Sequence, residues 1–151
     1  MEVMYSDILV PTDGGESVGQ VLEHTVDIAE GRNVTAHVLY VVDDRAFLAM
    51  DDEMHDEVLE NLETEGEAAV TRVREALESE GIEVSTAISR GDPADCIVSY
   101  VEEAGIDLIT MGTHAGEYEK NLLGSTSQKV VTKSAVPVLT VDVSGSSDGQ
   151  E

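Results

Sequence analysis

The chain has 151 residues, 41% of them hydrophobic, and its 32 acidic against 8 basic residues give a formal net charge of -24. This length supports one core of ordinary size and is too short for two comfortable domains. The hydrophobic residues are frequent and periodic, which excludes the disorder that such a charge usually indicates. There is no basic face to displace counterions, so the composition excludes duplex nucleic acid as a partner.

The composition also indicates where the protein works. No apolar stretch approaches the roughly 18 residues of a membrane span, and Met1 to Asp7 is acidic, so we expect neither a membrane partner nor a secretory signal. Cys96 is alone, and the scattered histidines give no metal-site pattern. These features predict a soluble, cytoplasmic protein. An acidic, lysine-poor surface is typical of proteins adapted to molar salt, where the Debye length is about 3 Å, and therefore indicates an extreme halophile.

The first half of the chain alternates strand and helix patterns. Asp7 to Pro11 is a short apolar run that predicts a buried strand, and the turn TDGGES leads into a helix with apolar residues at helical spacing from Val18 to Ala29. Val34 to Val42 predicts a second strand. A long helix follows from Met54 to about Ser79, because apolar residues recur along one stripe.

The second half continues the alternation. Ile82 to Ile88 predicts a third strand, and RGDPADC opens a helix with Asp92 as cap and Pro93 as first residue, which Gly105 ends. A fourth strand, a last helix and a fifth strand follow at 107–111, 125–134 and 136–141. Pro137 cannot donate to a ladder, which favours a sheet edge or a strand start. Residues 144–151 form a polar tail that we expect to be disordered, which leaves a domain at 1–143.

This alternation predicts a single doubly wound α/β domain, a Rossmann-like parallel sheet of five strands with helices on both faces. Ligands of such sheets bind beyond the carboxyl ends of the strands, where the strand order reverses. Two glycine-rich turns, TDGGES and Met111 to Thr126 (MGTHAGEYEKNLLGST), follow the first and fourth strands. If these strands are neighbours, both turns meet in one crevice.

The second turn can be read in two ways. Gly112 follows the fourth strand and Gly124 precedes the last helix, whose first N–H groups and positive dipole end suit an anion, with Ser125 and Thr126 as hydroxyl donors. Alternatively, Ser125 and Gln128 form a capping box that needs no ligand. The pattern alone leaves both readings open.

The lysines favour the anion reading. The chain has three lysines, and all of them lie between Gly112 and Val136, beside the candidate phosphate site. They are Lys120, Lys129 and Lys133. The alternative is that they complement the carboxyl end of a helix, which suits Lys133 and Lys129 but not Lys120.

Asp13 is the other residue of interest, since it ends the first strand. Its carboxylate can accept hydrogen bonds from an adenine amino group or a ribose hydroxyl, or it can cap the next helix, which is the commoner use. We expect His114 to be exposed in its loop, and His24 and His37 to be structural. Cys96 is expected to be a small buried side chain rather than a nucleophile.

Taken together, the pattern resembles the universal stress protein family over nearly the whole chain. The segments that carry the resemblance are DILVPTDGGES, HVLYVVDD, RGDPADCIVSYVEEAGIDLITMGTH and LLGSTSQKVVTKSAVPVLTV. The resemblance implies a five-stranded parallel α/β domain of strand order 3-2-1-4-5 that commonly dimerises through its last strand, here Val136 to Val141. It also implies ATP binding, in one branch, through G-x2-G-x9-G-[S/T] after the fourth strand.

Carried over by position, the resemblance implies a nucleotide site. It places Pro11, Thr12 and Asp13 at the adenosine end, Val41 against the base, Met111, Gly112, Gly124, Ser125 and Thr126 along the ribose and phosphates, and His114, Ala115 and Gly116 in the middle of the loop. The chain departs from the motif there. Ala115 stands where the second glycine belongs, Gly116 comes one position late, and eleven residues rather than twelve separate Gly112 from Gly124.

The leading hypothesis is therefore a homodimeric stress-response sensor or adaptor that binds ATP or another adenine nucleotide, with Mg²⁺ as a candidate companion ion and a protein partner that the sequence does not identify. The alternative is a nucleotide-free dimerisation module. Slow ATP hydrolysis is a weaker alternative, since the sequence distinguishes no catalytic residue. An adenylating enzyme, on the strength of GGES, and a receiver domain are weaker still.

Overall fold

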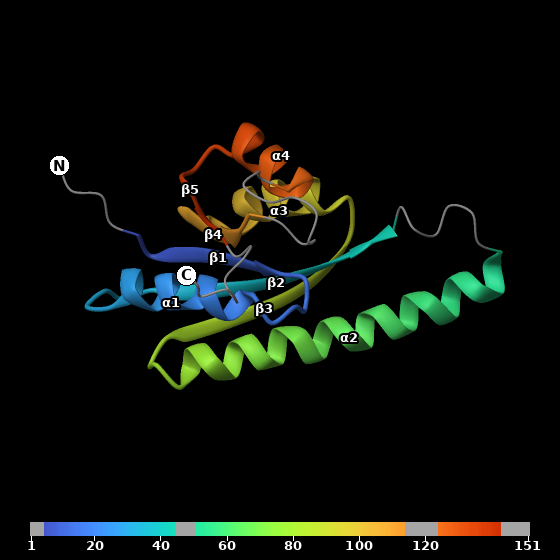
Figure 1. Ribbon diagram of the computed structural model, residues 1–151, viewed down its shortest axis with the longest axis horizontal. Helices are drawn as coiled ribbons and strands as arrows, with labels where there is room; N and C mark the ends of the chain where they lie inside the picture. Colours follow the sequence, from blue (N-terminus) through green and yellow to red (C-terminus); the bar gives the residue numbers. More distant parts are fainter. Residues whose placement is uncertain (1–4, 45–50, 114–123, 143–151) are drawn as a thin grey trace, which may run out of the picture.

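The five strands form one parallel sheet in the order β3-β2-β1-β4-β5. In this computed structural model, residues 5–44, 51–113 and 124–142 are described. The strands are β1 (Asp7–Thr12), β2 (Thr35–Asp43), β3 (Glu83–Gly91), β4 (Leu108–Gly112) and β5 (Val138–Val141), and the helices are α1 (Val18–Ala29), α2 (Asp52–Glu78), α3 (Pro93–Ala104) and α4 (Ser125–Lys133) (Figure 1). The predicted strand order and alternation are confirmed.

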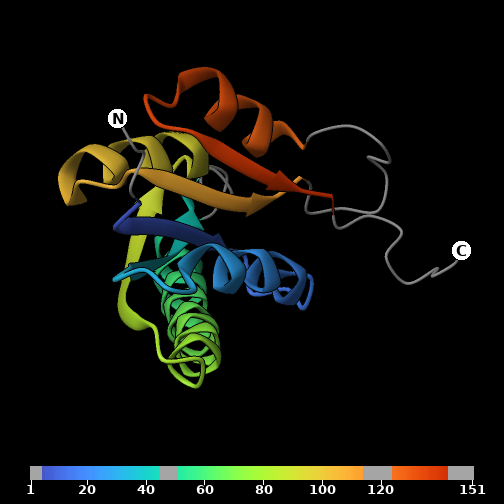
Figure 2. The ribbon, with the colours of Figure 1, turned by 90° about the vertical axis from the view of Figure 1, so that its left-hand side faces the viewer.

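The helices cover both faces of the sheet, with α1 and α2 on one face and α3 and α4 on the other (Figure 2). Successive side chains of a strand point to opposite faces, so β1 contributes to both cores. Ile8 and Val10 pack with residues of α1, whereas Leu9 packs with Ile97 of α3 and Val130 of α4. All five of these side chains are essentially buried, which fixes β1 in the centre of the molecule.

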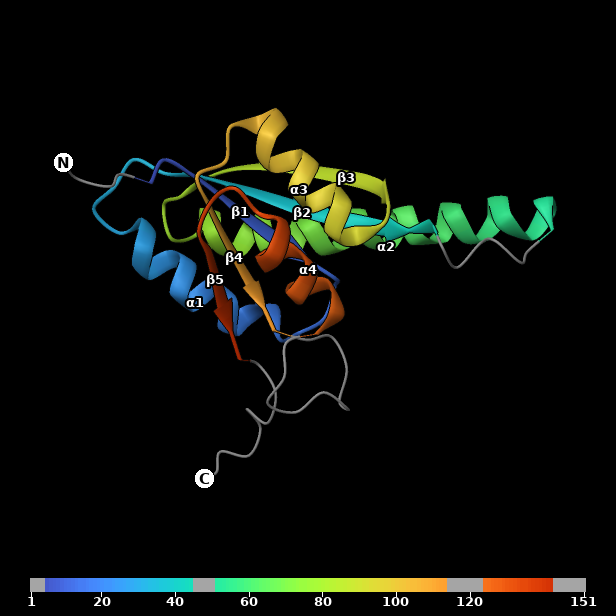
Figure 3. The ribbon, with the colours of Figure 1, turned by 90° about the horizontal axis from the view of Figure 1, so that it is seen from above.

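Helix α2 is longer than the face that it covers. It begins at Asp52 rather than at the predicted Met54, because the Asp51 side chain caps it by accepting a hydrogen bond from the Met54 N–H. Its carboxyl-terminal half buries Ala69, Val73 and Leu77 against the sheet. Its amino-terminal part extends beyond the sheet (Figure 3), and Met54 is 53% exposed. The predicted apolar stripe is therefore buried only where the sheet lies beneath it.

The local signals around α3 and β5 act as predicted. The Asp92 side chain accepts a hydrogen bond from the Asp95 N–H, Pro93 opens α3, and Gly105 ends it at φ 69°. Pro137 lies directly before β5, which is the edge strand of the sheet. The predicted tail, residues 144–151, and hence the predicted domain boundary, lie outside the described residues.

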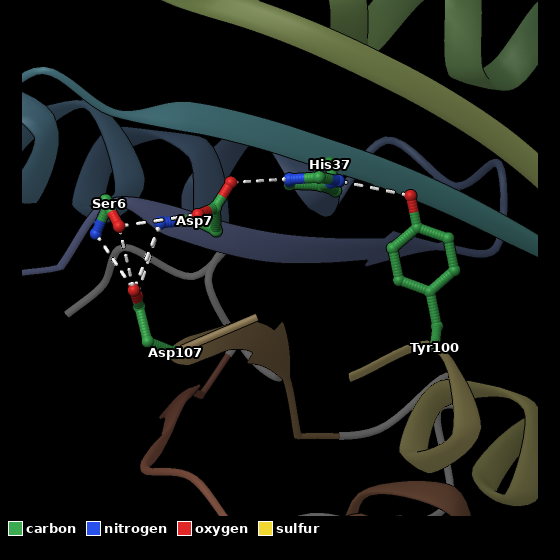
Figure 4. A network of polar contacts seen from close by, with 5 residues as sticks. All are labelled: Ser6, Asp7, His37, Tyr100 and Asp107. Carbon is green, nitrogen blue, oxygen red and sulfur yellow. Dashed lines mark hydrogen bonds and ion pairs between the residues drawn. The ribbon is translucent and has the colours of Figure 1, made fainter. Parts of the chain in front are cut away.

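A network of polar side chains fastens the amino-terminal ends of β1, β2 and β4 (Figure 4). The Asp107 carboxylate accepts hydrogen bonds from the backbone N–H of Ser6 and of Asp7. His37 of β2 bonds to Asp7 through Nε2 at 3.0 Å and to the Tyr100 hydroxyl of α3 through Nδ1 at 3.1 Å. The structural role predicted for His37 is thereby confirmed.

His24 differs from His37. It lies exposed on α1, and no described residue is seen to bond to it, so the structural role predicted for it is not found. No helix in the described ranges has both the length and the apolar character needed to cross a membrane.

A close contact inside the fold explains a glycine in the middle of a helix. Gly66 lies in α2 against the ring of Tyr40 in β2, and a Cβ atom at Gly66 would lie 2.6 Å from Tyr40 Cδ1. Glycine in a helix interior costs about 1 kcal/mol relative to alanine, so its presence here reflects the space that the buried ring needs.

We therefore expect Gly66→Ala to lower the free energy of unfolding by about 1–2 kcal/mol, because overpacking outweighs the gain in helix propensity. Urea unfolding measures the change. Gly19→Ala in α1 is the matched control, since a Cβ there meets nothing within 4 Å, and it should leave stability equal or higher. A Gly66→Ala protein as stable as the control would contradict the packing argument.

Candidate functional site

The candidate site opens where β1 and β4 separate. The two strands pair at Ile8–Leu108 and Leu9–Ile109, whereas β1 and β2 stay paired up to Thr12. Beyond the β1–β4 pairs the strands no longer share a ladder. A hollow therefore begins at the carboxyl edge of the sheet, at the point of strand-order reversal.

The sequence of β1 explains the separation. The N–H and C=O of one strand residue point to the same side, and successive residues alternate. The Asp7 carbonyl accepts a hydrogen bond from the Asp107 N–H on the β4 side, so Leu9 and Pro11 also face β4. Pro11 has no N–H to donate, and the ladder toward β4 cannot continue through it.

The resulting pocket has a volume of about 400 Å³, within the range of small-molecule sites. It brings together nine of the residues predicted from the sequence, namely Pro11, Thr12, Asp13, Val41, Met111, Gly112, Gly124, Ser125 and Thr126. The predicted His114, Ala115 and Gly116 lie outside the described residues. The first turn and the described ends of the second line one crevice, as their positions after neighbouring strands predicted.

Sequence reasoning missed part of the lining. The additional residues are Ser17, Val18 and Val21 from the start of α1, Leu39 and Asp43 from β2, Pro93 and Ile97 from the start of α3, and Ser127 from α4. The residues at the helix starts could have been predicted, because in a parallel α/β sheet the helices that follow the strands begin at the carboxyl edge, beside the ligand site.

The turn after β1 is held by its own side chains. Thr12 Oγ1 accepts a hydrogen bond from the Gly14 N–H at 3.1 Å, and Asp13 Oδ1 accepts one from the Gly15 N–H at 2.8 Å. Asp13 therefore closes an Asx turn and does not cap α1, whose N-cap is Ser17. The commoner of the two uses considered for Asp13 is wrong, and Asp13 is instead one of the residues that line the pocket.

The same bonds bear on the adenylating alternative. A pyrophosphate loop presents free backbone N–H groups to the anion. In TDGGES the N–H groups of Gly14 and Gly15 are engaged by Thr12 and Asp13. This turn does not offer them to a phosphate.

The start of α4 differs from the predicted capping box. Gly124 is the N-cap, Ser125 is the first helical residue, and no side chain caps this helix end within the described residues. The residues of this first turn line the pocket, no side chain caps their N–H groups, and the positive end of the helix dipole lies there. The reading of this turn as an anion site gains from this arrangement, whereas the capping-box reading is wrong.

Two bonds fasten the ends of the loop that precedes α4. The Gly124 N–H donates to the Thr113 carbonyl. Ser127, whose side chain is buried, donates its hydroxyl to the Gly112 carbonyl at 2.7 Å. The end of β4 and the first turn of α4 are thus joined directly, through residues on either side of 114–123.

The lysines are not arranged as their position in the sequence suggested. Lys133 Nζ lies 3.1 Å from Asp95 Oδ1 and Lys129 Nζ lies 3.7 Å from Asp92 Oδ1, so both side chains join α4 to the start of α3. Neither lines the pocket, and Lys120 lies outside the described residues. The two described lysines therefore neutralise acids of the neighbouring helix and do not supply charge to the pocket.

Comparison with known proteins assigns the chain to a family. Residues 4–142 match the model of the universal stress protein family. The chain belongs to this family. The universal stress protein MJ0531 of Methanocaldococcus jannaschii is 34% identical over 142 residues, which cover 93% of this chain and 84% of the relative.

Solved structures of universal stress proteins share the fold. The structure of hypothetical protein MJ0577, from the same organism, matches with a TM-score of 0.83 and 33% identity over 93% of this chain and 97% of that one. Universal stress protein UspA from Lactobacillus plantarum matches with a TM-score of 0.76 and 28% identity, over 93% and 99% of the two chains.

A second hollow of this universal stress protein lies between the turns that follow α1 and α2. Its volume is about 500 Å³, and it is lined by Glu30, Arg32, Glu80 and Glu83 together with turn residues. It is larger than the pocket at β1 and β4, but it lies at the amino-terminal ends of β2 and β3, away from the carboxyl edge where ligands of this architecture bind.

In the described ranges no three His, Cys, Asp or Glu side chains gather in a way that could hold a metal ion.

Cys96 lies in α3, partly buried beside acidic groups. Burial raises the pKa of its thiol, and the charges of Asp92, Asp44 and Asp95 raise it further. A raised pKa means less thiolate at neutral pH, the opposite of what a nucleophile needs. This agrees with the structural role expected for Cys96.

Alkylation of Cys96 by iodoacetamide should therefore be slower near neutral pH than that of free cysteine, and its rate should rise to a plateau at a higher pH. Rates measured across a pH series on folded protein test this. The urea-unfolded chain is the control and should react like free cysteine. If the folded protein reacted as fast as free cysteine at neutral pH, the structural role of Cys96 would be refuted.

Proposed function

We propose that this universal stress protein binds an adenine nucleotide, ATP, ADP or AMP, in the pocket between β1 and β4, and acts as a homodimeric stress-response sensor or adaptor. The observation that carries the proposal is the uncapped start of α4 facing the Asp13 turn across one pocket. One end offers hydrogen-bond donors to an anion, and the other offers a carboxylate acceptor. A nucleotide needs both.

The phosphate end would be formed by backbone. The N–H groups of Ser125 and Thr126 and their hydroxyls lie at the first turn of α4, where the helix dipole favours negative charge. The hydrogen bond between Ser127 and the Gly112 carbonyl holds this turn against the end of β4. We propose that this fastening preserves phosphate binding although Ala115 replaces the second glycine of the family motif. A bound Mg²⁺ would then be held chiefly by phosphate oxygens.

The adenosine end would be formed by β1 and β2. Asp13 uses one carboxylate oxygen in its Asx turn, and its other oxygen would accept a hydrogen bond from the adenine amino group or a ribose hydroxyl. Val41 and Met111 line the same pocket and would contact the base and the ribose. Two analogues distinguish these donors. Inosine monophosphate lacks the adenine amino group, and 2′,3′-dideoxyadenosine monophosphate lacks both ribose hydroxyls.

Relatives support this ligand class. A universal stress protein has been solved in complex with cAMP, and a family member from Arabidopsis thaliana has been solved with AMP bound. Both share the fold of this chain, with TM-scores of 0.66 and 0.68. Their ligands are adenine nucleotides, the class that we propose for this pocket.

The homodimer would form through the edge strand β5. Its four residues are all partly exposed, and an edge strand presents unpaired backbone groups that a second copy can pair. A chain that dimerises but binds no nucleotide would be the interaction module considered as the alternative.

Isothermal titration in concentrated KCl tests the phosphate end. Ser125→Pro removes one N–H at the first helical position, where proline is tolerated, and Gly124 already has the extended conformation (φ -65°, ψ 164°) that precedes proline. We expect ATP affinity to fall by about tenfold or more, because a hydrogen bond to a charged group is lost, while adenosine affinity stays unchanged.

Ser125→Ala is the control for the hydroxyl and should cost less than Ser125→Pro. Equal ATP affinity in the proline variant and the wild type would exclude α4 as the phosphate site. The absence of saturable binding of any adenine nucleotide to the wild type, with a dimer intact by ultracentrifugation, would replace the proposal with the nucleotide-free alternative.

We further propose that the fold is adapted to molar salt, as its charge of -24 suggests. Raising KCl should raise the melting temperature, because mutual repulsion of the acidic surface is screened. Circular dichroism melts over a KCl series measure this, with NaCl at equal ionic strength as the control for general screening. A melting temperature that does not change with salt would refute the adaptation.

A further inference from the structure

Helix α2 contacts the turn that carries Asp13, although the two are far apart in sequence. Arg72 Nη2 of α2 donates a hydrogen bond to the Gly14 carbonyl at 3.2 Å. Gly14 has a φ of +89°, a conformation that residues with a side chain rarely adopt. The turn is therefore held in an unusual backbone conformation, and a guanidinium from another element bonds to its most unusual residue.

Tyr40 fills the space between α2 and this turn. Its ring lies against Gly66 of α2, and a Cβ atom on Gly14 would lie 3.8 Å from Tyr40 Cε2 and 3.7 Å from the Cβ of Ala69. Tyr40 is 9% exposed. Burial raises the pKa of its phenol, and the charges of Glu65 and Asp13 add to the rise.

The turn is thus held from two sides. From within, Thr12 and Asp13 accept the N–H groups of Gly14 and Gly15. From outside, Arg72 bonds to the Gly14 carbonyl, and the Tyr40 ring and Ala69 occupy the space that a side chain on Gly14 would enter. The Asx turn of Asp13 leaves its carboxylate little freedom, because moving it breaks the bond to the Gly15 N–H.

We propose that Arg72 and Tyr40 are positioning residues, which hold the Asp13 carboxylate in place for the nucleotide and so make α2 part of the binding apparatus. The effect on nucleotide binding rests on the proposed function, whereas the contact between Arg72 and the Gly14 carbonyl does not. Neither residue lines the pocket, and both act through the Asp13 turn.

The contact is tested without any nucleotide. Arg72→Met keeps most of the aliphatic stem and removes the guanidinium, so amide hydrogen exchange of Gly14 and Gly15 should become about threefold faster or more. Gly66→Ala, which displaces the Tyr40 ring, should also speed exchange there. Arg74→Met is the matched control, since it removes the same charge from the same helix, and Arg74 makes no hydrogen bond seen among the described residues. Unchanged exchange in Arg72→Met would overturn the inference.

The consequence for binding is tested by a double-mutant cycle with ATP. If Arg72 acts through Asp13, Arg72→Met should weaken ATP binding by about threefold or more in the wild type and should have no effect in the Asp13→Ala background. Arg72→Lys, which keeps a cationic donor, should restore part of the affinity. The same loss in both backgrounds would show a merely structural role and overturn the inference. Absence of ATP binding in the wild type would overturn the proposed function instead, and the exchange experiment would still decide the contact.

Discussion

The early end of the pairing between β1 and β4 is the constraint on which the rest of the site depends. The strands are fastened at their amino-terminal ends, where the Asp107 carboxylate accepts the N–H groups of Ser6 and Asp7. They separate toward their carboxyl ends, where Pro11 has no N–H to offer. A longer ladder between β1 and β4 would close the hollow. Loss of the hydrogen bonds at their amino-terminal ends would leave the register of the two strands unfixed. The place of the pocket is thus set by sheet pairing.

The two ends of the pocket are held by different means. The Asp13 turn depends on side chains, its own and those of Arg72 and Tyr40, and on a glycine at positive φ. The start of α4 depends on backbone, with Ser127 as the buried side chain that joins it to β4. Side-chain support can be tuned by single substitutions, whereas the geometry of a helix end changes little. The proposed base end is therefore the part of the pocket more open to adjustment.

The parts of the fold that the sequence predicted are those encoded by short-range signals. The start and end of α3 follow from Asp92, Pro93 and Gly105 within one segment, and the parallel sheet between two helix layers follows from the alternation of strand and helix patterns. The strand order came from the family resemblance, because alternation alone fits more than one order. The use of Asp13 was not predictable in this way, because a cap and an Asx turn require the same residue type. They differ only in which N–H the folded turn brings near.

The candidate site was predictable in its positions but not in its bonds. Most of the residues inferred from the family motif do line the pocket. The partners of Lys129 and Lys133 depend on how α3 packs on α4, which no local pattern records. No local pattern marks Ser127, and only the fold shows its bond to Gly112. Long-range contacts decide such roles.

A chain with a net charge of -24 would repel a nucleotide at low salt, and the pocket draws on neither described lysine to offset this. At molar salt the Debye length falls to about 3 Å, so the repulsion from distant carboxylates is screened. Hydrogen bonds from backbone N–H groups act within that distance and survive. At molar salt, the proposed phosphate site at a helix end would therefore serve better than one built from lysines, whose longer-range attraction would be screened along with the repulsion.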